Sequence, residues 1–515
     1  MKKYLLVIIV AALCSCTKQP SLPNIVILYA DDMGYGDLAI QNPDAKLTTP
    51  NLDKLASEGI RFTDGHSSSG ICTPSRFALL TGQYHWRRFH GIVGPFGPSK
   101  FVDSDLTLPE MLKESGYTTA CIGKWHLGWD WEPLKKADAK AEPLSETDKR
   151  MAFGPEDFDW SKSIPDGPTA HGFDYYFGDG TINFPPYTFV ENDKVYKIPT
   201  EAFDMRGMKT KEGGWEFRPG PMAKDWNPYD VLPTLKDKAV EWIENQDADK
   251  PFFLYMPFPS PHAPIIPTSE FDGKTQAGAY GDYIYQTDYV AGEILKAIDR
   301  KGFTDNTLVI FTADNGPEHY AYPRIRNTGH YSMGSLRGLK RDIYEGGHRV
   351  PFVVKWPGRI EEGIVSDVLI HQVDLFRTIF AVVENCDDGT GYSVLGTRLD
   401  DTVAIDGVDQ LPYLLGETDE ALRTFAVHNT FADGFVMRKG DWVLIERYTG
   451  HHTRVPEWFL EDHGYEPIDK SVEGQLFNLK DDPSQKVNLY QENPEKVQKL
   501  KADLKAEKNR KTVLK

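Results

Sequence analysis

Asn24-Ile25-Val26-Ile27-Leu28-Tyr29-Ala30-Asp31-Asp32 is the stretch from which the fold of this chain can be read. The run from Asn24 to Ala30 is apolar at almost every position, as in a strand whose two faces are both covered. Such strands belong to parallel sheets with helices on both sides. The run leads directly into two aspartates. The stretch therefore predicts a central strand of an α/β sheet with carboxylates at its C-terminal end.

The chain after Ala30 continues to alternate between short apolar strands and amphipathic helices. Thr107 and Glu110 form a capping-box pattern at the start of one of these helices. Further strands are predicted at 118–123, 252–256, 308–313 and 351–355, and further helices at 50–58, 234–245 and 283–300. We predict an α/β fold with a large, mostly parallel sheet sandwiched by helices. Residues 130 to about 230 mix Trp, Pro and Gly without periodicity, which predicts a loop-rich insertion.

The last hundred residues have a different pattern. Apolar segments at 435–438 and 442–445 flank Lys439-Gly440-Asp441, which predicts a hairpin, and another strand is predicted at 475–479. Asn493-Pro494 begins a Lys-rich helix. We predict a catalytic α/β domain over residues 22–420 and a smaller C-terminal α+β subdomain with an antiparallel sheet over 421–515.

The N-terminus resembles a processing signal. Lys2-Lys3 precedes an apolar run from Tyr4 to Leu13 that is too short to span a bilayer. The run ends in Leu13-Cys14-Ser15-Cys16, which resembles a bacterial lipobox; an ordinary secretory signal cut nearby is the alternative. We expect residues 1–16 to be a lipoprotein signal with Cys16 lipidated. The protein would then be exported and held to a membrane by its lipid, in the periplasm or on the outer membrane or cell surface.

Composition limits the ligands of this chain. It has 58 Lys and Arg against 76 Asp and Glu, a formal net charge of −18. Nucleic-acid binding requires a basic surface, so we expect no nucleic-acid partner. An anionic substrate would need a local cluster of cationic side chains.

One of the five cysteines has a distinctive setting, Ser69-Gly70-Ile71-Cys72-Thr73-Pro74-Ser75-Arg76. Pro74 and Gly82 mark the two ends of a short helix. Cys72 is predicted to lie at its N-terminus, where free N–H groups favour negative charge. Two cysteines fall in the signal, and the three that remain do not make a disulfide framework. Cys121 fits a buried strand position and Cys386 a loop.

Polar groups follow four predicted strands. They are Asp31-Asp32, Lys124 with His126, His262, and Asp314-Asn315. Ligands of open parallel sheets bind outside the carboxyl ends of the strands, so these groups should meet. The three aspartates and the Asn315 amide oxygen suit Ca²⁺ or Mg²⁺. An Asp pair after a strand also caps turns, but two acidic strand ends in register favour the metal site.

Several basic side chains would supply the positive charge that the overall composition lacks. They are Lys124, His126, His262 and Lys340. A solvated Lys or a hydrogen-bonded core His is the alternative for each. His319, His330 and His348 follow the Asp314-Asn315 strand end and either line the same pocket or face solvent.

Cys72-Thr73-Pro74-Ser75-Arg76 with the following Leu80-Thr81-Gly82 resembles the signature of the type I, formylglycine-dependent sulfatases, which have an alkaline-phosphatase-like fold. Other segments resemble the same family in the same order: Asp31–Asp37, Thr49–Asp53, Gly123–Gly128, His171–Asp174, Pro261–Pro264 and Thr312–Gly316. The resemblance implies that a formylglycine-generating enzyme oxidises Cys72 to Cα-formylglycine, whose hydrated gem-diol attacks the sulfur of a sulfate ester.

The resemblance also implies a role for each site residue. Arg76 would hold the diol, and Lys124 and Lys340 would bind sulfate oxygens. His262 would protonate or polarise the leaving oxygen, and His126 would remove the second diol proton. The ligands of one Ca²⁺ would be Asp31, Asp32, Asp314, Asn315 and the diol at Cys72. A further donor would come from Thr181 or Asn183.

The expected substrate is a sulfated saccharide. The segment 171–187 looks closest to enzymes acting on galactose or N-acetylgalactosamine 6-sulfate. Tyr84–His90 mixes rings with cations and either contacts sugar or packs internally. The alternatives are a phosphomonoesterase or phosphodiesterase of the same superfamily and a catalytically silent glycan-binding protein at the cell surface. Cys72 and the oxygen-only ligand set argue against the phosphoesterase, because such relatives use Ser or Thr and two zinc ions.

Overall fold

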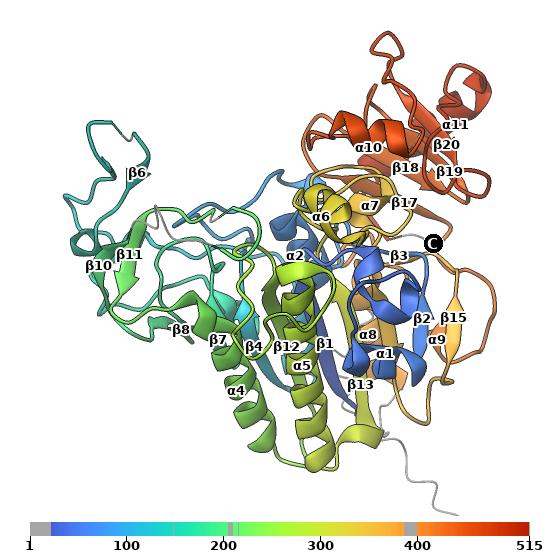
Figure 1. Ribbon diagram of the computed structural model, residues 1–515. Helices are drawn as coiled ribbons and strands as arrows, with labels where there is room; N and C mark the ends of the chain where they lie inside the picture. Colours follow the sequence, from blue (N-terminus) through green and yellow to red (C-terminus); the bar gives the residue numbers. More distant parts are fainter. Residues whose placement is uncertain (1–21, 148, 204–209, 215, 386–398, 514–515) are drawn as a thin grey trace, which may run out of the picture.

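The computed structural model describes residues 22–147, 149–203, 210–214, 216–385 and 399–513. The predicted signal 1–16, with Cys16, and the predicted loop at Cys386 lie outside these residues. Within the described part of the chain, no helix has the length and apolar character needed to cross a bilayer. The chain forms a large sheet covered by helices and a second, smaller sheet near its C-terminus (Figure 1).

The large sheet has ten strands in the order β15-β2-β14-β13-β1-β12-β4-β7-β8-β9. Its centre is parallel, from β13 through β1, β12 and β4 to β7, whereas β14, β8 and β9 pair antiparallel. The central strands are β1 (Asn24–Asp31), β4 (Thr118–Lys124), β7 (Tyr175–Asp179), β12 (Phe252–Pro261) and β13 (Thr307–Ala313). The outer strands are β2 (Ile60–Phe62), β8 (Val190–Glu191), β9 (Lys194–Val195), β14 (Phe352–Lys355) and β15 (Ile364–Ser366). The predicted α/β fold is confirmed.

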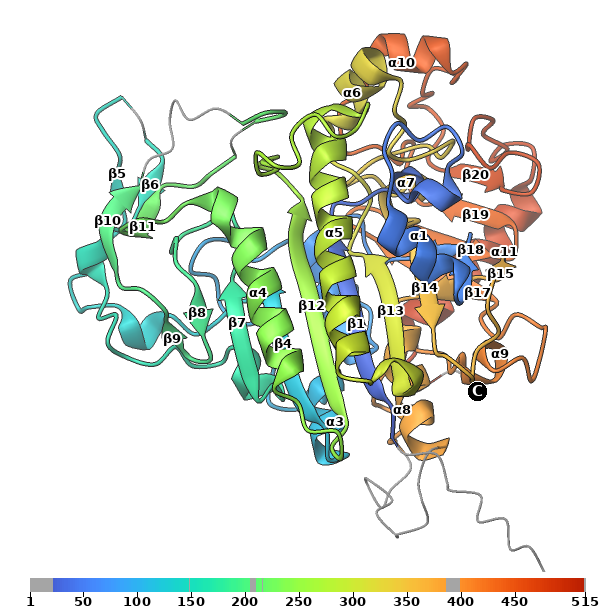
Figure 2. The same ribbon diagram turned by 60° about the horizontal axis from the view of Figure 1, so that its bottom comes forward.

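Helices cover both faces of this sheet, as the apolar β1 sequence predicts (Figure 2). Ile25, Ile27 and Tyr29 pack in one core with α2, α3 and α8. Val26 and Leu28 pack in a second core with α1, α4 and α5. The helices of the two layers are α1 (Pro50–Ser57), α2 (Cys72–Thr81), α3 (Leu108–Glu114), α4 (Val231–Glu244), α5 (Gly278–Arg300) and α8 (Asp374–Asn385).

The boundaries of α2 follow from local sequence. Pro74 lies in its first turn, where no intrahelical N–H is needed. Gly82 ends it in the left-handed region at φ 62°, a conformation that costs glycine little. The capping box of Thr107 and Glu110 is present at the start of α3.

The prediction of a loop-rich insertion over residues 130–230 is wrong for β7, which pairs with β4 as a strand of the main sheet. This strand is short and contains Gly178 and Asp179, so its sequence carries a weak strand signal. Its pairing is decided by the neighbouring strand. β8 and β9 of the same segment extend the main sheet beyond β7. Two small sheets also form there, of β5 (Glu142–Pro143) with β6 (Met151–Ala152) and of β10 (Pro199–Phe203) with β11 (Gly220–Ala223).

The C-terminal sheet is antiparallel, in the order β17-β18-β19-β20, with α11 beside it. The predicted hairpin and terminal helix are present, whereas β17 was not anticipated. Ala78 of α2 and Tyr84 pack in one core with this sheet, so it lies directly behind the Cys72 helix. Its elements are β17 (Phe425–Asn429), β18 (Phe435–Lys439), β19 (Trp442–Ile445), β20 (Gln475–Asn478) and α11 (Pro494–Asn509). The described residues also form the smaller elements β3 (Gly65–His66), β16 (Ile370–His371), α6 (Ala321–Thr328), α7 (Glu345–His348), α9 (Leu411–Leu414) and α10 (Glu457–Asp462). The boundary at 420/421 stays a prediction.

Candidate active site

Four adjacent strands of the parallel centre carry polar side chains to one edge of the sheet. Asp31 ends β1 and Lys124 ends β4, while Asp314 directly follows β13 and His262 directly follows β12. These strands are neighbours in the order β13-β1-β12-β4, so residues almost 300 positions apart in the chain become neighbours in space. The ten site residues predicted from sequence all gather at this edge.

Each buried carboxylate of the site has a cationic partner. Lys124 Nζ lies 2.5 Å from Asp31, and Lys340 Nζ lies 2.7 Å from Asp32. Arg76 Nη2 lies 2.7 Å from Asp314 and 3.5 Å from Asp31. Burial alone would raise the pKa of Asp31, but Lys124, His262 and Arg76 hold it well below its usual value. Asp31 is therefore ionised.

The oxygen atoms of this site fit a hard cation. Asp31 Oδ1 and Asn315 Oδ1 are buried and have no hydrogen-bond partner within the described residues. The Asn315 amide nitrogen donates to Asp32 over 2.7 Å, which leaves its oxygen free to bind a ligand. Burial and the neighbouring Asp31 raise the pKa of Asp314 to about 7. A bound divalent cation would offset that repulsion and occupy both unpartnered oxygens, so the residues fit an ion such as Ca²⁺.

Cys72 begins α2 and is only 2% exposed. Its sulfur lies within 4.8 Å of carboxylate oxygens of Asp31 and Asp314. Burial raises the pKa of the thiol even though Lys124 opposes the shift. The unmodified side chain is therefore a protonated thiol and a weak nucleophile. Arg76, one turn later in α2, also donates from Nη1 to the carbonyl oxygen of Lys124 over 3.1 Å.

Two histidines border the same site. His126 adopts a left-handed backbone conformation, φ 50°, and its Nε2 lies 3.0 Å from the carbonyl oxygen of Val93. His262 Nε2 lies 3.8 Å from Asp32. Burial, joined by Lys124 for His126 and by Lys340 for His262, lowers both pKa values. Both imidazoles are neutral near pH 7.

Sequence reasoning missed Glu318, a buried carboxylate behind Lys340. Its oxygens lie 3.7 Å from Lys340 Nζ and 2.5 Å from Arg341 Nη1. Burial alone would raise the pKa of Glu318, but His319, Lys340 and Arg341 keep it low. Glu318 therefore fixes two cations at the site rim. The sequence feature that could have identified Glu318 is its position four residues after Asp314, on the same loop.

Other residues considered from the sequence lie elsewhere. His330 Nε2 contacts Asp37 at 2.8 Å, so that histidine is a core residue. His348 belongs to a separate buried cluster, and His319 bonds Glu318 next to it. The Tyr84–His90 segment packs internally, which was the second of the two roles considered for it. Arg87 is bonded to Asp406 and Arg88 to Asp105, while His85 and Trp86 are buried.

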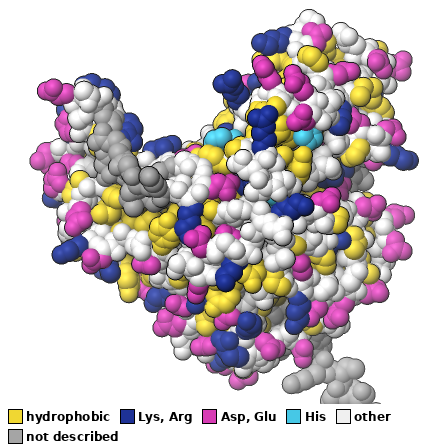
Figure 3. Space-filling model, in the orientation of Figure 1, with side chains coloured by type: hydrophobic (Ala, Val, Ile, Leu, Met, Phe, Trp, Pro, Cys, Tyr) yellow, Lys and Arg dark blue, Asp and Glu magenta, His cyan; other side chains and the backbone are white. Residues whose placement is uncertain are grey.

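A pocket adjoins His126. Thr181 and aromatic rings line it, including Phe184, Trp129 and Trp131. Thr181 donates to Asn183 over 3.2 Å, so the two proposed donors are linked. The space-filling view shows a broad hollow between the 130–230 insertion and the C-terminal sheet, with histidine and apolar side chains at its floor (Figure 3). His126 thus borders both the charged site and a pocket with an apolar wall.

Comparison with known proteins identifies the family. The family profile described as Sulfatase matches residues 23–385. An N-acetylgalactosamine-6-O-sulfatase of Bacteroides thetaiotaomicron is 31% identical over 95% of this chain and 93% of its own length. The N-acetylgalactosamine-6-sulfatase of Canis lupus familiaris is 32% identical over 80% of this chain and 70% of its own.

Solved structures agree with this assignment. One comes from work on the metabolism of multiple glycosaminoglycans by Bacteroides thetaiotaomicron; it has a TM-score of 0.74 and 30% identity, and covers 95% of this chain and 100% of that one. The PsFucS1 sulfatase from Pseudoalteromonas sp. has a TM-score of 0.70 and 25% identity, covering 96% and 92%. With Cys72 and its cationic and acidic surroundings in place, the chain belongs to the sulfatase family of sulfuric ester hydrolases.

Proposed function

We propose that this protein removes 6-O-sulfate from N-acetylgalactosamine or galactose units of sulfated glycans, using a formylglycine made from Cys72 and a calcium ion. The observation that carries the proposal is the position of Cys72. It lies between two carboxylates of an oxygen-rich cation site, beside Lys124 and Arg76, with a thiol that burial keeps protonated. A protonated thiol has little use in that position, whereas a hydrated aldehyde has two hydroxyl groups for its neighbours to bind.

The calcium ion would be held by Asp31, Asp32, Asp314 and Asn315. When bound, it supplies fixed positive charge next to the sulfuryl oxygens, where negative charge grows in the transition state. The formylglycine supplies a nucleophile that can release sulfate without attack of water on sulfur. Side chains of the protein itself would bind the sulfate ester and transfer the protons.

Arg76 and the two lysines shape the electrostatics of the site. The guanidinium of Arg76 is held by Asp314, so it stays fixed while it binds the oxygen of residue 72. Lys124 and Lys340 are held by Asp31 and Asp32, and each has further N–H groups for sulfate oxygens. Three cations balance three carboxylates without the metal, so a bound dication makes the site attractive to an anionic ester.

The two histidines are suited to proton transfer. His262 Nε2 lies 3.8 Å from Asp32, whose negative charge opposes the lowering of the His262 pKa by burial and Lys340. Once protonated at Nε2, His262 would give that proton to the departing sugar oxygen. His126 faces the cavity and would take the proton from the second hydroxyl of residue 72. The alternative phosphoesterase is not favoured, because such enzymes need a Ser or Thr nucleophile and zinc ligands at the place of Cys72 and its oxygen donors.

The substrate assignment is supported by the two relatives described above, both 6-sulfatases of N-acetylgalactosamine. The aromatic wall formed by Phe184 and Trp129 offers the apolar surface that a sugar face packs against. We also propose that the chain is exported and anchored through a lipid on Cys16, as its N-terminal sequence indicates, and that a maturation enzyme of the host converts Cys72.

Two measurements test this function. Mass analysis of the Cys72 peptide from active protein of the native host should find aldehyde in place of thiol, and active enzyme with only unmodified Cys72 would refute the mechanism. A panel of defined mono- and disaccharides, sulfated at single positions, should release sulfate fastest from 6-O-sulfated N-acetylgalactosamine or galactose. Faster cleavage of phosphate esters than of every sulfate ester would refute the class of reaction. Metabolic labelling with a fatty-acid analogue, compared between the native chain and Cys16→Ala, tests the anchor.

A further inference from the structure

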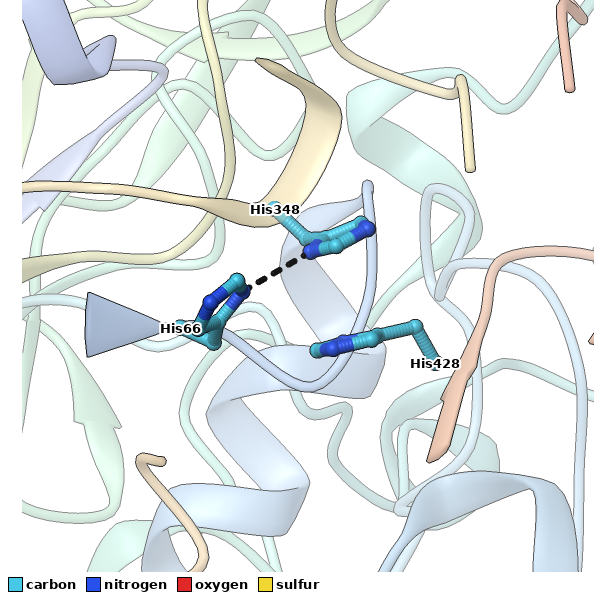
Figure 4. Close-up of side chains that lie close together, drawn as sticks. All are labelled: His66, His348 and His428. Atoms are coloured by element: carbon cyan, nitrogen blue, oxygen red, sulfur yellow. Dashed lines mark hydrogen bonds between the residues drawn. The ribbon is translucent and has the colours of Figure 1, made fainter. Parts of the chain in front are cut away.

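A second cluster of potential metal ligands lies behind the Cys72 helix, outside the site described above. His66 of β3, His348 of α7 and His428 of β17 are each no more than 1% exposed. One ring nitrogen from each lies within 4.8 Å of the others. The three rings come from segments far apart in the chain and lie together, with the ring of His348 stacked on that of His428 (Figure 4). No residue of this cluster has a part in the hydrolysis.

The protonation of His66 is set by its neighbours. Its Nε2 lies 2.8 Å from Asp64 Oδ1, and Asp64 also receives two hydrogen bonds from Arg438. Arg438 Nη1 lies 3.0 Å from the same His66 Nε2, so the Asp64 and Arg438 contacts favour opposite tautomers. The tautomer in which Nε2–H donates to Asp64 leaves a lone pair on His66 Nδ1. A carboxylate that accepts from the outer nitrogen of a histidine is the usual support of a metal-binding imidazole.

The lone pair of His66 points into the cluster. His66 Nδ1 and His348 Nδ1 are 3.1 Å apart. Two ligand nitrogens of a tetrahedral zinc ion, with Zn–N bonds near 2.05 Å, are about 3.3 Å apart. The spacing of this pair is therefore that of two ligands on one ion, and it is also that of a hydrogen bond from His348 to His66.

The surroundings of His428 favour a bound metal ion over a simple hydrogen bond between His348 and His66. Its ring stacks on His348 with centroids 3.7 Å apart, and neither of its nitrogens has a hydrogen-bond partner among the described residues. His348 Nε2 is likewise buried without a partner in that part of the chain. A hydrogen bond between His66 and His348 leaves both nitrogens of His428 buried without a partner among the described residues, whereas a metal ion would bind the lone pair of one of them.

We propose that His66, His348 and His428 bind one transition-metal ion of the zinc class. Three imidazoles suit Zn²⁺, in contrast to the oxygen donors at Asp31 and Asp314, which suit Ca²⁺. Burial lowers the pKa of all three rings, so they are in the neutral form that metals bind. The charged groups around the cluster, Asp64 and Glu345 with Arg349 and Arg438, already pair with one another.

The position of this site gives it a structural role. His66 precedes the Ser67–Gly70 segment that leads to Cys72, and His428 lies on the first strand of the C-terminal sheet. Gly70 N also donates to Thr430 just after that strand. An ion bound by His66 and His428 would tie the C-terminal sheet to the segment that sets the N-terminus of the Cys72 helix.

The test is metal analysis of the full-length mature protein. Protein from zinc-supplemented growth is desalted and analysed by inductively coupled plasma mass spectrometry; we expect about one zinc per chain. Replacement of zinc by Co²⁺ should give the visible absorption of tetrahedral cobalt. His428→Gln should lose both signals, while Asp314→Asn, at the strand-end site, and His330→Gln, a buried histidine elsewhere, should keep them.

Three results would contradict the proposal or its structural role. Zinc lost in Asp314→Asn and kept in His428→Gln would place the ion at the strand-end site and overturn the proposal. Native protein with no zinc above the buffer blank, after incubation with excess zinc and desalting, would also overturn it, and this holds even if His428→Gln fails to fold. In the native protein, a zinc-selective chelator should lower the unfolding temperature; an unchanged temperature with zinc removed would overturn the structural role.

Discussion

Replacement of Lys340 by methionine separates its electrostatic and structural contributions. Lys340 Nζ lies 2.7 Å from Asp32 and 3.7 Å from Glu318, and its side chain is almost completely buried. Among the described residues, the Asp32 carboxylate then keeps one hydrogen bond, from Asn315. Breaking one partner of a buried ion pair costs about 3 kcal/mol or more. We therefore expect Lys340→Met to lower the free energy of unfolding of the calcium-free protein by about 3 kcal/mol.

Calcium should recover much of this loss, because the ion would pair with the Asp32 carboxylate that Lys340 no longer neutralises. Removal of a neighbouring positive charge should also tighten calcium binding. Activity should nevertheless fall, since a fixed cation that stabilises developing charge contributes about 100- to 1,000-fold to kcat. The predicted combination is a variant that binds calcium more tightly and hydrolyses sulfate esters far more slowly.

The assay for this prediction has two parts. Urea unfolding with and without calcium gives the stability, and initial rates of sulfate release at saturating calcium give kcat and KM. Lys355→Met is the matched control, because Lys355 forms a 2.7 Å pair with Glu58 away from the site. Weaker calcium binding by Lys340→Met than by the native protein, or an unchanged kcat, would refute this account of Lys340.

The remaining predictions concern three other parts of the molecule. Arg76→Lys cannot reproduce the two-nitrogen contact with Asp314, and we expect kcat to fall about 100-fold or more, measured with normally matured enzyme; a loss confined to KM would argue against a transition-state role. Phe184→Ala should raise KM for saccharide esters while leaving that for a small aryl sulfate unchanged, because the ring lines the cavity beside His126; equal effects on both substrates would contradict it. Burial and a neighbouring histidine lower the pKa of His85 from 6.5 to about 3, so the unfolded chain binds a proton there first. The contribution of His85 to stability should fall by about 1.4 kcal/mol per pH unit as pH drops below 6.5 toward 3, and His85→Gln should reduce the slope by that amount in pH-dependent urea unfolding.

Most of the site could be predicted from sequence because its residues follow from local rules. An apolar strand ending in Asp31-Asp32, another ending in Asp314-Asn315, and a cysteine before Pro74 each carry their signal within a few residues. Parallel strands must deliver their C-terminal residues to a common edge, so the sequence implied that these groups meet. The motif around Cys72 then separated a sulfatase from other enzymes on the same sheet.

Other features depended on contacts that no local pattern records. β7 is a strand because β4 offers it unpaired backbone groups, and its own residues give little indication of that. Arg87 turned inward to Asp406, which is more than 300 residues away in sequence. Glu318 became part of the site only through the fold of the loop that also carries Lys340.

The sequence by itself determined the family, the place of Cys72 at a helix N-terminus and the acidic strand ends, since these depend on residue type and on short spacing. The tertiary structure alone decided which cation pairs with which carboxylate, and it brought together His66, His348 and His428 from three distant segments. The physical reason is that a buried ion pair or ligand cluster is stabilised by its surroundings in three dimensions, and those surroundings are set by strand order and packing rather than by neighbours in the chain.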